Sequence, residues 1–200
     1  VRFGPQAPTP EREILATAFA VHPDYSSSVT HDVATVTLSA DAPVAPVPWN
    51  RAPLGDGLLG VSLDLVGYGE TVSGEADPTY FRRRAAVDVA EVTDLQLRWS
   101  ADDANICDGD SGGAAFLDEE LVGVLVEGDT FCLEWGAAVR VDAVADWLDG
   151  EAPGDDDDAG LELPDDDDDV VAAGCDGCSS GAGTPAPFVG LLLTGGLRCR

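Results

Sequence analysis

Ser111 is the side chain in this sequence best placed to do chemistry, because it lies in the glycine-rich stretch ICDGDSGGAAF, residues 106–116. A serine hydroxyl attacks poorly at neutral pH unless a base takes its proton and donors hold the oxyanion that forms. Glycines let the backbone bend so that amide N–H groups converge beside the serine oxygen. We expect the amides of Gly109 and Ser111 to do so. The stretch therefore predicts a nucleophile loop, which needs a proton acceptor.

Two histidines are available as proton acceptors, His22 and His31. His31 directly precedes Asp32. Because neighbours on a strand point to opposite faces, Asp32 cannot easily orient that imidazole. His22 lies in the string VHPDY, at a strand-to-turn position upstream of Asp32. We interpret both histidines as structural residues, so the base for Ser111 is missing from the sequence.

The segments around these residues are predicted to be short strands separated by turns. Apolar and polar residues alternate in some of these segments, and apolar residues follow one another in others. The predicted strands are 33–38, 61–69, 85–92, 121–128 and 136–141. This spacing favours an antiparallel barrel or sandwich. One helix follows, for which Asp142 is the expected N-cap and Gly150 the stop.

The string CDGDSGG, residues 107–113, resembles the nucleophile motif of the trypsin/chymotrypsin-like serine proteases. Four further segments are similar to parts of that family, in the family's order: 22–39, 66–74, 121–141 and 144–148. The resemblance covers nearly all of residues 1–150, which we expect to form a trypsin-like serine protease domain. It implies an all-β fold of two antiparallel six-stranded barrels, the first one incomplete here, with the site between them and a short C-terminal helix.

The resemblance also implies roles for the residues that match the family's motifs. Asp32 matches the aspartate that orients the base. Gly109 and Ser111 match the residues whose amides form the oxyanion hole, and Ser111 is the nucleophile. Asp110 matches the acid that pairs with a new amino terminus on activation, and that pair shapes the oxyanion hole.

A disulfide and a substrate pocket are the remaining features that the resemblance implies. Cys107 is expected to pair with Cys132 and so to tie the nucleophile loop to the pocket wall; two buried free thiols are the alternative. Asn105 falls at the base of the primary pocket, where its neutral side chain does not support a strict preference for Arg or Lys. Gly128 and Gly136 fall where the family keeps the pocket walls open, so a sizeable side chain is expected to enter.

The family's base stands in a TAAHC-like string several tens of residues before the aspartate, and no such string occurs among the 31 residues before Asp32. We expect the chain to be a fragment whose missing N-terminal part carried the histidine. It begins with Val1 rather than Met, within what looks like an interior strand of the first barrel. The implied activity is serine-type peptide hydrolysis through a Ser-His-Asp triad, with this fragment inactive as it stands. The alternative is a catalytically inactive homologue that acts as a binding module at the cell surface.

Charge restricts the partners of this 200-residue chain, which has ten arginines, no lysine and a formal net charge of −28. Such a surface repels phosphate backbones, so we expect no nucleic-acid partner. Protein or peptide substrates are the partners that remain.

Residues 151–170 contain two aspartate runs and are predicted to be a disordered acidic linker, because blocks of like charge repel and stay extended. Carboxylates are ligands of calcium, so a calcium-responsive acidic surface protein is a third hypothesis. Adjacent aspartates lack the spaced ligands and the turn glycine of a formed calcium loop. We therefore expect neither a metal nor another cofactor.

Residues 171–200 contain Cys175 and Cys178, then an apolar run from about 187 to 197, then terminal arginines. No second cysteine pair or histidine follows, so a four-ligand zinc site cannot be completed. This segment resembles the C-terminal sorting signals of myxobacterial surface proteins. The resemblance implies processing at or near Cys175 or Cys178, and a secreted bacterial protein held at the cell surface through its tail. The apolar run, about 11 residues long, is too short to span a membrane unaided, and a disordered tail is the alternative.

Overall fold

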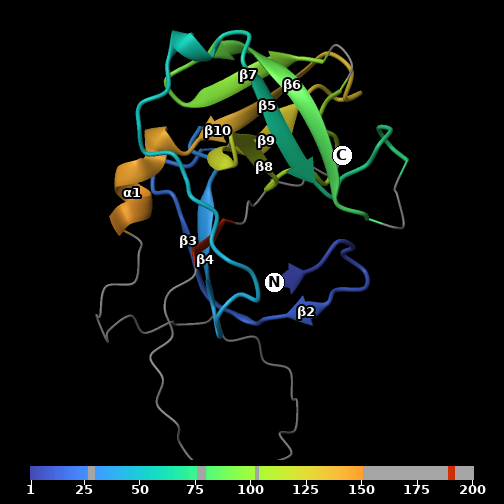
Figure 1. Ribbon diagram of the computed structural model, residues 1–200, viewed down its shortest axis with the longest axis vertical. Helices are drawn as coiled ribbons and strands as arrows, with labels where there is room; N and C mark the ends of the chain where they lie inside the picture. Colours follow the sequence, from blue (N-terminus) through green and yellow to red (C-terminus); the bar gives the residue numbers. More distant parts are fainter. Residues whose placement is uncertain (27–29, 76–79, 102–103, 151–188, 192–200) are drawn as a thin grey trace, which may run out of the picture.

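The structure is a computed structural model whose elements form an all-β architecture with one short helix near residue 150 (Figure 1). It describes residues 1–26, 30–75, 80–101, 104–150 and 189–191. The predicted linker and the sorting cysteines Cys175 and Cys178 lie outside these residues. In the part of the chain that the structure describes, no helix has both the length and the apolar character needed to cross a membrane.

Six antiparallel strands close into a barrel in the order β10-β7-β6-β5-β8-β9. The strands are β5 (Ser62–Gly67), β6 (Arg83–Val92), β7 (Gln96–Ser100), β8 (Ala114–Leu117), β9 (Glu120–Gly128) and β10 (Trp135–Arg140). Closure leaves the barrel without an unpaired strand edge. The barrel confirms the predicted fold for the second half of the domain.

The barrel interior is filled by the apolar side chains that the sequence pattern places on one face. Along β5, Leu63 and Leu65 are buried while their neighbours are partly exposed, as the alternation predicts. β9 is buried from Val122 to Val126, which agrees with its continuous apolar run. Trp99 of β7 is the largest side chain of this core and is 1% exposed.

Two of the strands in the barrel, β7 and β8, were not predicted from the sequence. β8 consists of four residues, of which two are alanines with little preference for strands. β7 carries Gln96 and Arg98 beside the buried Leu97 and Trp99. Both segments become strands because their neighbours in the barrel pair with them, and this pairing is not visible in a short sequence window.

The first half of the domain is built from two small sheets that do not close into a barrel. A three-stranded sheet has the order β11-β4-β3, and a two-stranded sheet pairs β1 with β2. Their strands are β1 (Arg2–Phe3), β2 (Arg12–Glu13), β3 (Ala16–Val21), β4 (Ala34–Leu38) and β11 (Val189–Leu191). β11, drawn in red beside β4 in Figure 1, pairs antiparallel with β4. The first barrel is therefore incomplete, as predicted.

The start of the chain differs from the expected interior strand of the first barrel. β1 has two residues and pairs only with β2, and Val1 is 41% exposed. β3, which was not predicted, is exposed along most of its length, and Phe19 within it is 71% exposed. Leu15 just before it is 73% exposed. This part of the domain presents apolar side chains that nothing among the described residues covers.

The domain ends in a 3₁₀ turn, η2 (Asp142–Val144), followed by the helix α1 (Ala145–Gly150); a second 3₁₀ turn, η1 (Asp56–Leu58), precedes β5. The expectation that Asp142 caps the helix is wrong, because Val141 holds the N-cap position and Asp142 is the first residue of η2. Its carboxylate instead pairs with Arg140 at 2.7 Å and accepts the N–H of Leu54 at 2.8 Å. The partly buried acid is thus committed to tertiary contacts that join the segment before β5 to the end of β10.

Candidate active site

The nucleophile loop is a tight turn that leads from the disulfide into β8. The N–H of Asp110 donates to the carbonyl of Cys107 at 3.0 Å, and that of Gly113 donates to the carbonyl of Asp110 at 2.8 Å. Gly109 and Gly112 both have φ of +90°, in the region where side chains are strained. The loop therefore depends on glycine at the two positions that flank the central pair of residues.

Ser111 lies at the exposed tip of this loop, where a substrate could reach it. Its Oγ donates to the carbonyl oxygen of Val126 at 3.3 Å. The amides of Gly109 and Ser111 donate to no group among the described residues. The predicted nucleophile and the two predicted oxyanion donors thus lie together, with the donors unoccupied by intramolecular partners.

Asp110 is partly buried, and its carboxylate stabilises the loop through hydrogen bonds. Its carboxylate accepts the N–H of Gly69 at 2.8 Å and that of Cys107 at 2.9 Å. Desolvation raises the pKa of this carboxyl, although the two amide donors and nearby Arg83 act in the opposite direction. The ammonium group of Val1 donates to Ile14 at 2.6 Å instead, so no terminal amine pairs with Asp110 here.

Gly67 allows the Asp110 carboxylate to approach β5, because a Cβ built at position 67 would lie 2.0 Å from Oδ1 of Asp110. We expect Gly67→Ala to displace that carboxylate and to lower the free energy of unfolding by about 2 kcal/mol or more, as overpacking does. Gly57→Ala is the matched control, since a Cβ there meets nothing within 4 Å. Urea unfolding of both variants measures the effect; equal stabilities would contradict the packing described here.

Asp32 is buried just before β4, with 7% of its surface exposed. Desolvation raises the pKa of its carboxyl, and the nearby Glu127 raises it further. Among the described residues this carboxylate accepts no hydrogen bond. Val33, the residue after Asp32, packs in the same apolar cluster as Val126 of β9, and the carbonyl of Val126 accepts the hydrogen bond of Ser111. The predicted orienting acid and the predicted nucleophile are therefore both near this strand.

The two histidines stack on each other in the hairpin between β3 and β4, with ring centroids 4.5 Å apart and planes 18° apart. His22 also packs against Trp147 of α1, at 5.0 Å between centroids. Within the described residues, neither imidazole is hydrogen-bonded to Ser111 or to Asp32. This arrangement agrees with the interpretation that neither histidine is the base.

The side chain of Asn105, at the predicted pocket base, makes three hydrogen bonds. Its Oδ1 accepts the indole N–H of Trp99 at 3.0 Å, and its Nδ2 donates to the carbonyl of Trp135 at 3.0 Å and to Asp129 at 3.4 Å. A Cβ at Gly136 would lie 2.6 Å from this Oδ1. The amide of Asn105 is therefore already occupied by protein partners.

Gly128 and Gly136 lie side by side as a register pair of β9 and β10. A Cβ at Gly128 would lie 2.9 Å from the carbonyl of Trp135 and 3.5 Å from Ile106. The three predicted pocket residues, Asn105 included, are thus brought together. Their role as a substrate pocket stays a prediction.

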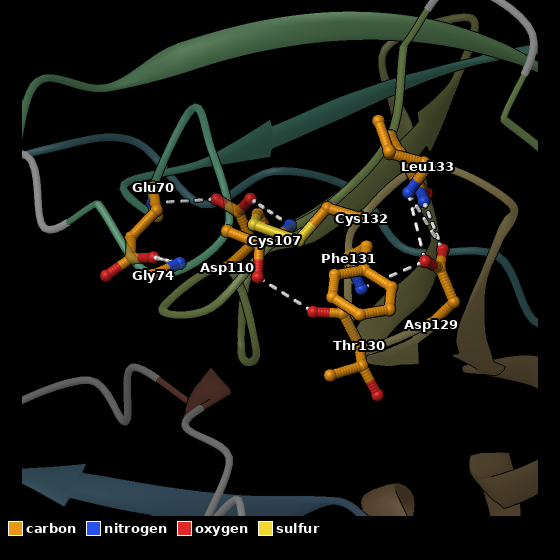
Figure 2. The surroundings of a disulfide bond; sticks show 12 residues. Glu70, Gly74, Cys107, Asp110, Asp129, Thr130, Phe131, Cys132 and Leu133 are labelled. Carbon is orange, nitrogen blue, oxygen red and sulfur yellow. Dashed lines mark hydrogen bonds between the residues drawn. A yellow bond between two sulfur atoms is a disulfide. The ribbon is translucent and has the colours of Figure 1, made fainter.

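A disulfide joins Cys107 to Cys132, as the resemblance implied (Figure 2). It links the nucleophile loop to the segment between β9 and β10. That segment is organised by Asp129, whose carboxylate accepts backbone N–H groups at 2.7 to 3.1 Å. The donors are Phe131, Leu133, Glu134 and Trp135. The loop that carries Cys132 is therefore fixed both by the disulfide and by the carboxylate of Asp129. Sequence reasoning did not identify Asp129.

Asp129 is expected to make stability depend on pH. Desolvation opposes its charge, but the four amide donors outweigh that effect and lower its pKa to about 2. The contribution of the charged form is complete above the ordinary pKa near 4 and disappears as the pH falls toward about 2. We expect Asp129→Asn to lower stability at pH 7 and to weaken its loss between pH 4 and pH 2. Denaturant unfolding at several pH values measures this, and the exposed Asp41→Asn serves as a control that should resemble the parent protein.

A cavity of about 400 Å³ lies beside Asp110 and the disulfide. Its lining includes Gly69, Arg83, Asn105, Cys107, Asp110 and Leu133, but not Ser111. The guanidinium of Arg83 reaches the carbonyl of Gly69 at 3.2 Å, close to the amide that holds Asp110. Sequence reasoning did not find this cavity, because its walls come from five separate parts of the chain.

Comparison with known proteins agrees with this geometry. The protein-family profile described as Trypsin matches residues 4–148. Mouse neuropsin, whose structure is titled a serine protease expressed in the limbic system of the brain, is similar at a TM-score of 0.62 and 21% identity, over 70% of this chain and 71% of that one. Human heparin binding protein is similar at 0.60 and 19% identity, over 70% and 68% of the two chains. No curated protein matches the sequence significantly. At these identities the structural similarity shows the fold alone.

Proposed function

This chain belongs to the trypsin family of serine proteases, and on that premise we propose that it is part of a serine-type endopeptidase. In this proposal Ser111 is the nucleophile, Asp32 orients the base, and protein or peptide chains are the substrates. The base is a histidine that residues 1–200 do not supply. The chain by itself is then expected to turn over substrate poorly.

The observation that carries this proposal is that Asp32 is 7% exposed and that no group among the described residues donates a hydrogen bond to its carboxylate. An imidazole N–H placed above the end of β9 would satisfy that carboxylate. Its other nitrogen could then take the proton that Ser111 now gives to the carbonyl of Val126. The exposed apolar side chains of Leu15 and Phe19 offer a surface on which further polypeptide, carrying this histidine, could pack.

The proposed reaction follows from the groups around Ser111. Its oxygen attacks the substrate carbonyl carbon while the imidazole accepts the proton. The negative charge that develops on the carbonyl oxygen is held by the amides of Gly109 and Ser111, which have no intramolecular partner among the described residues. The imidazole returns the proton to the leaving amine as the C–N bond breaks. Water then attacks the acyl-enzyme and releases the second product.

Free imidazole offers a test with the chain as it exists. We propose to incubate the 200-residue protein with a fluorophosphonate, with and without imidazole, and to map the covalent adduct by peptide mass spectrometry. The expected result is slow labelling of Ser111 that imidazole accelerates. If Ser111 stays unlabelled at all imidazole concentrations while the protein is folded, the catalytic role proposed for it is wrong.

The second candidate is a catalytically inactive homologue that works as a surface binding module. It is favoured by the hydrogen bond of Ser111 to a carbonyl rather than to a base. The name of human heparin binding protein shows that a similar fold is known for a polyanion binder. A net charge of −28 speaks against such a ligand for this chain. Absence of Ser111 labelling in the imidazole experiment would favour this candidate, with an uncharged or basic protein partner.

We propose that the enzyme does not strictly require Arg or Lys as the substrate residue that enters the primary pocket. Asn105 at the predicted pocket base carries no charge, and its amide is already bonded to Trp99, Trp135 and Asp129. Gly128 and Gly136 are proposed as the pocket walls. A peptide library cleaved by the complete enzyme would test this preference.

Secretion and retention at a bacterial cell surface remain proposals, based on the resemblance of residues 171–200 to sorting signals. Processing would occur at or near Cys175 or Cys178, and intact-mass measurement of the surface protein would test it: a C-terminus at Arg200 excludes processing. β11 lies within the apolar run of this tail and pairs with β4. The same residues cannot lie in a membrane and pair with β4 at once, so anchoring would require β11 to leave the sheet.

A further inference from the structure

We propose that His22, Asp24 and His31 form a binding site for a divalent transition-metal ion of the Zn²⁺ class. One ligand atom of each side chain lies within 4.8 Å of the other two. Imidazole nitrogens with a carboxylate oxygen are a donor set that such ions accept, and water can complete the coordination. The site does not depend on the proposed protease function, because none of the three residues has a role in that reaction.

The hairpin between β3 and β4 brings the three side chains together through backbone hydrogen bonds. The N–H of His22 donates to the carbonyl of Val33 at 3.1 Å, and the N–H of Tyr25 donates back to His22 at 3.0 Å. Further out, the N–H of Ser26 donates to the carbonyl of Thr30 at 3.2 Å. The two arms that carry the ligands are therefore held in register before any ion binds, which lowers the cost of ordering them.

His31 carries the clearest sign of a missing partner, since its buried Nδ1 has no hydrogen bond among the described residues. Buried polar nitrogens almost always have a partner. His31 also has φ of 52°, an uncommon backbone conformation for a residue other than glycine. An ion bound to this nitrogen would accept its lone pair and so remove the cost of burying it unpaired.

The two rings must move slightly before they can share an ion. They stack at 4.5 Å with planes 18° apart, so the nitrogen lone pairs of the two rings lie in separate, nearly parallel planes. Ligand atoms in a tetrahedral site with bonds of 2.0–2.1 Å lie about 3.3 Å apart. The imidazole of His31 can turn about its Cβ–Cγ bond to converge on the ion, and no hydrogen bond among the described residues is broken by that turn.

Nearby hydrogen bonding and charge are compatible with a bound cation at this site. Nδ1 of His22 accepts the N–H of Asp24 at 3.2 Å, a long hydrogen bond that a metal–nitrogen bond would replace. The exposed Asp24 carboxylate supplies negative charge, and the net charge of −28 attracts cations.

Packing alone is the competing explanation, because the imidazole pair rests on Trp147 of α1 and fills space there. A pair with only this role would have no affinity for metal ions. The two explanations differ in one measurable property, the ligation of an ion by imidazole.

Cobalt titration of the full chain distinguishes them. Cys175, Cys178 and Cys199 are first changed to serine so that the thiols of residues 171–200 cannot bind Co²⁺. We expect intense visible absorption, of the kind that four-coordinate Co²⁺ gives, which saturates at one ion per chain and is removed by Zn²⁺. His31→Gln is expected to weaken Co²⁺ binding at least about tenfold. Substitution of residues that only hydrogen-bond to a metal ligand already lowers metal affinity by about that factor.

Charge controls complete the test. Asp24→Asn should weaken Co²⁺ binding, whereas Asp41→Asn removes an exposed carboxylate elsewhere and should leave binding unchanged. Circular dichroism confirms that each variant is folded. Absorption that His31→Gln leaves unchanged, or only the faint absorption of ions on the aspartate runs, would overturn the proposal.

Discussion

Ser111→Ala is expected to abolish the imidazole-dependent labelling of the nucleophile loop by a fluorophosphonate. The reason is direct, since the variant keeps the oxyanion amides but has no oxygen to form the covalent bond. In the complete enzyme we expect the same change to lower kcat/KM by about 10³-fold or more, leaving only what binding and the oxyanion hole supply. Peptide mapping and single-turnover kinetics measure the two effects.

The labelling rate of Asp32→Asn distinguishes two roles for this carboxylate, one that orients the base and one that is structural only. We expect this variant to label more slowly than the parent at every imidazole concentration, because the carboxylate that would hold the added imidazole is gone. Labelling of the parent should rise with pH, since burial and Glu127 raise the pKa of Asp32 and its charged form must be present. Thermal unfolding controls for damage to the fold. Equal labelling rates of the variant and the parent would remove Asp32 from the mechanism.

Loss of the Cys107–Cys132 bridge is the second large expected effect. The bridge closes a loop with a sequence separation of 25 residues. On the chain-entropy account, a bridge over such a loop stabilises the native state by about 3.5 kcal/mol. We therefore expect the double change Cys107→Ala and Cys132→Ala to lower the free energy of unfolding by about that amount, as measured by urea denaturation. The loss should also disturb the amide of Cys107 that holds Asp110.

Removal of the other cysteines provides the control for this experiment. The triple change Cys175→Ser, Cys178→Ser and Cys199→Ser removes thiols that lie outside the described residues, and we expect the unfolding midpoint to stay the same. If the bridged pair can be removed with a change below about 1 kcal/mol, the entropic role assigned to the bridge does not hold. Addition of a reducing agent to the parent protein should reproduce the effect of the double variant.

Local chemistry was readable from the sequence because it depends on neighbours in the chain. The spacing around Ser111 predicted a glycine-rich turn, and the structure has that turn, with the amides of Gly109 and Ser111 bonded to nothing in the part of the chain that it describes. The alternation along β5 and the apolar run of β9 predicted strands that the barrel confirms. The family resemblance added the disulfide, which no spacing rule could have assigned.

One other local expectation failed where distant partners competed for the same group. Asp142 looks like a helix cap in the sequence, but Arg140 and the amide of Leu54 bind its carboxylate. The pocket-base role of Asn105 stays a prediction, while its amide is bonded to residues of β7, of β10 and of the loop between β9 and β10. A side-chain carboxylate or amide bonds to the partner that the fold brings within hydrogen-bond distance. The order of residues in the chain does not show which partner this is.

The sequence by itself determined which groups are present: a serine predicted to be a nucleophile, an aspartate predicted to orient a base, two histidines with no family base motif, and cysteines able to bridge. Only the tertiary structure decided where these groups meet. It brought Val33, the residue after Asp32, and the hydroxyl of Ser111 to Val126 of β9, and it stacked His22 on His31 with no hydrogen bond to Ser111 or Asp32 among the described residues. The physical reason is that burial, desolvation and hydrogen bonding arise between residues far apart in the chain, and these contacts exist only once the sheets have formed.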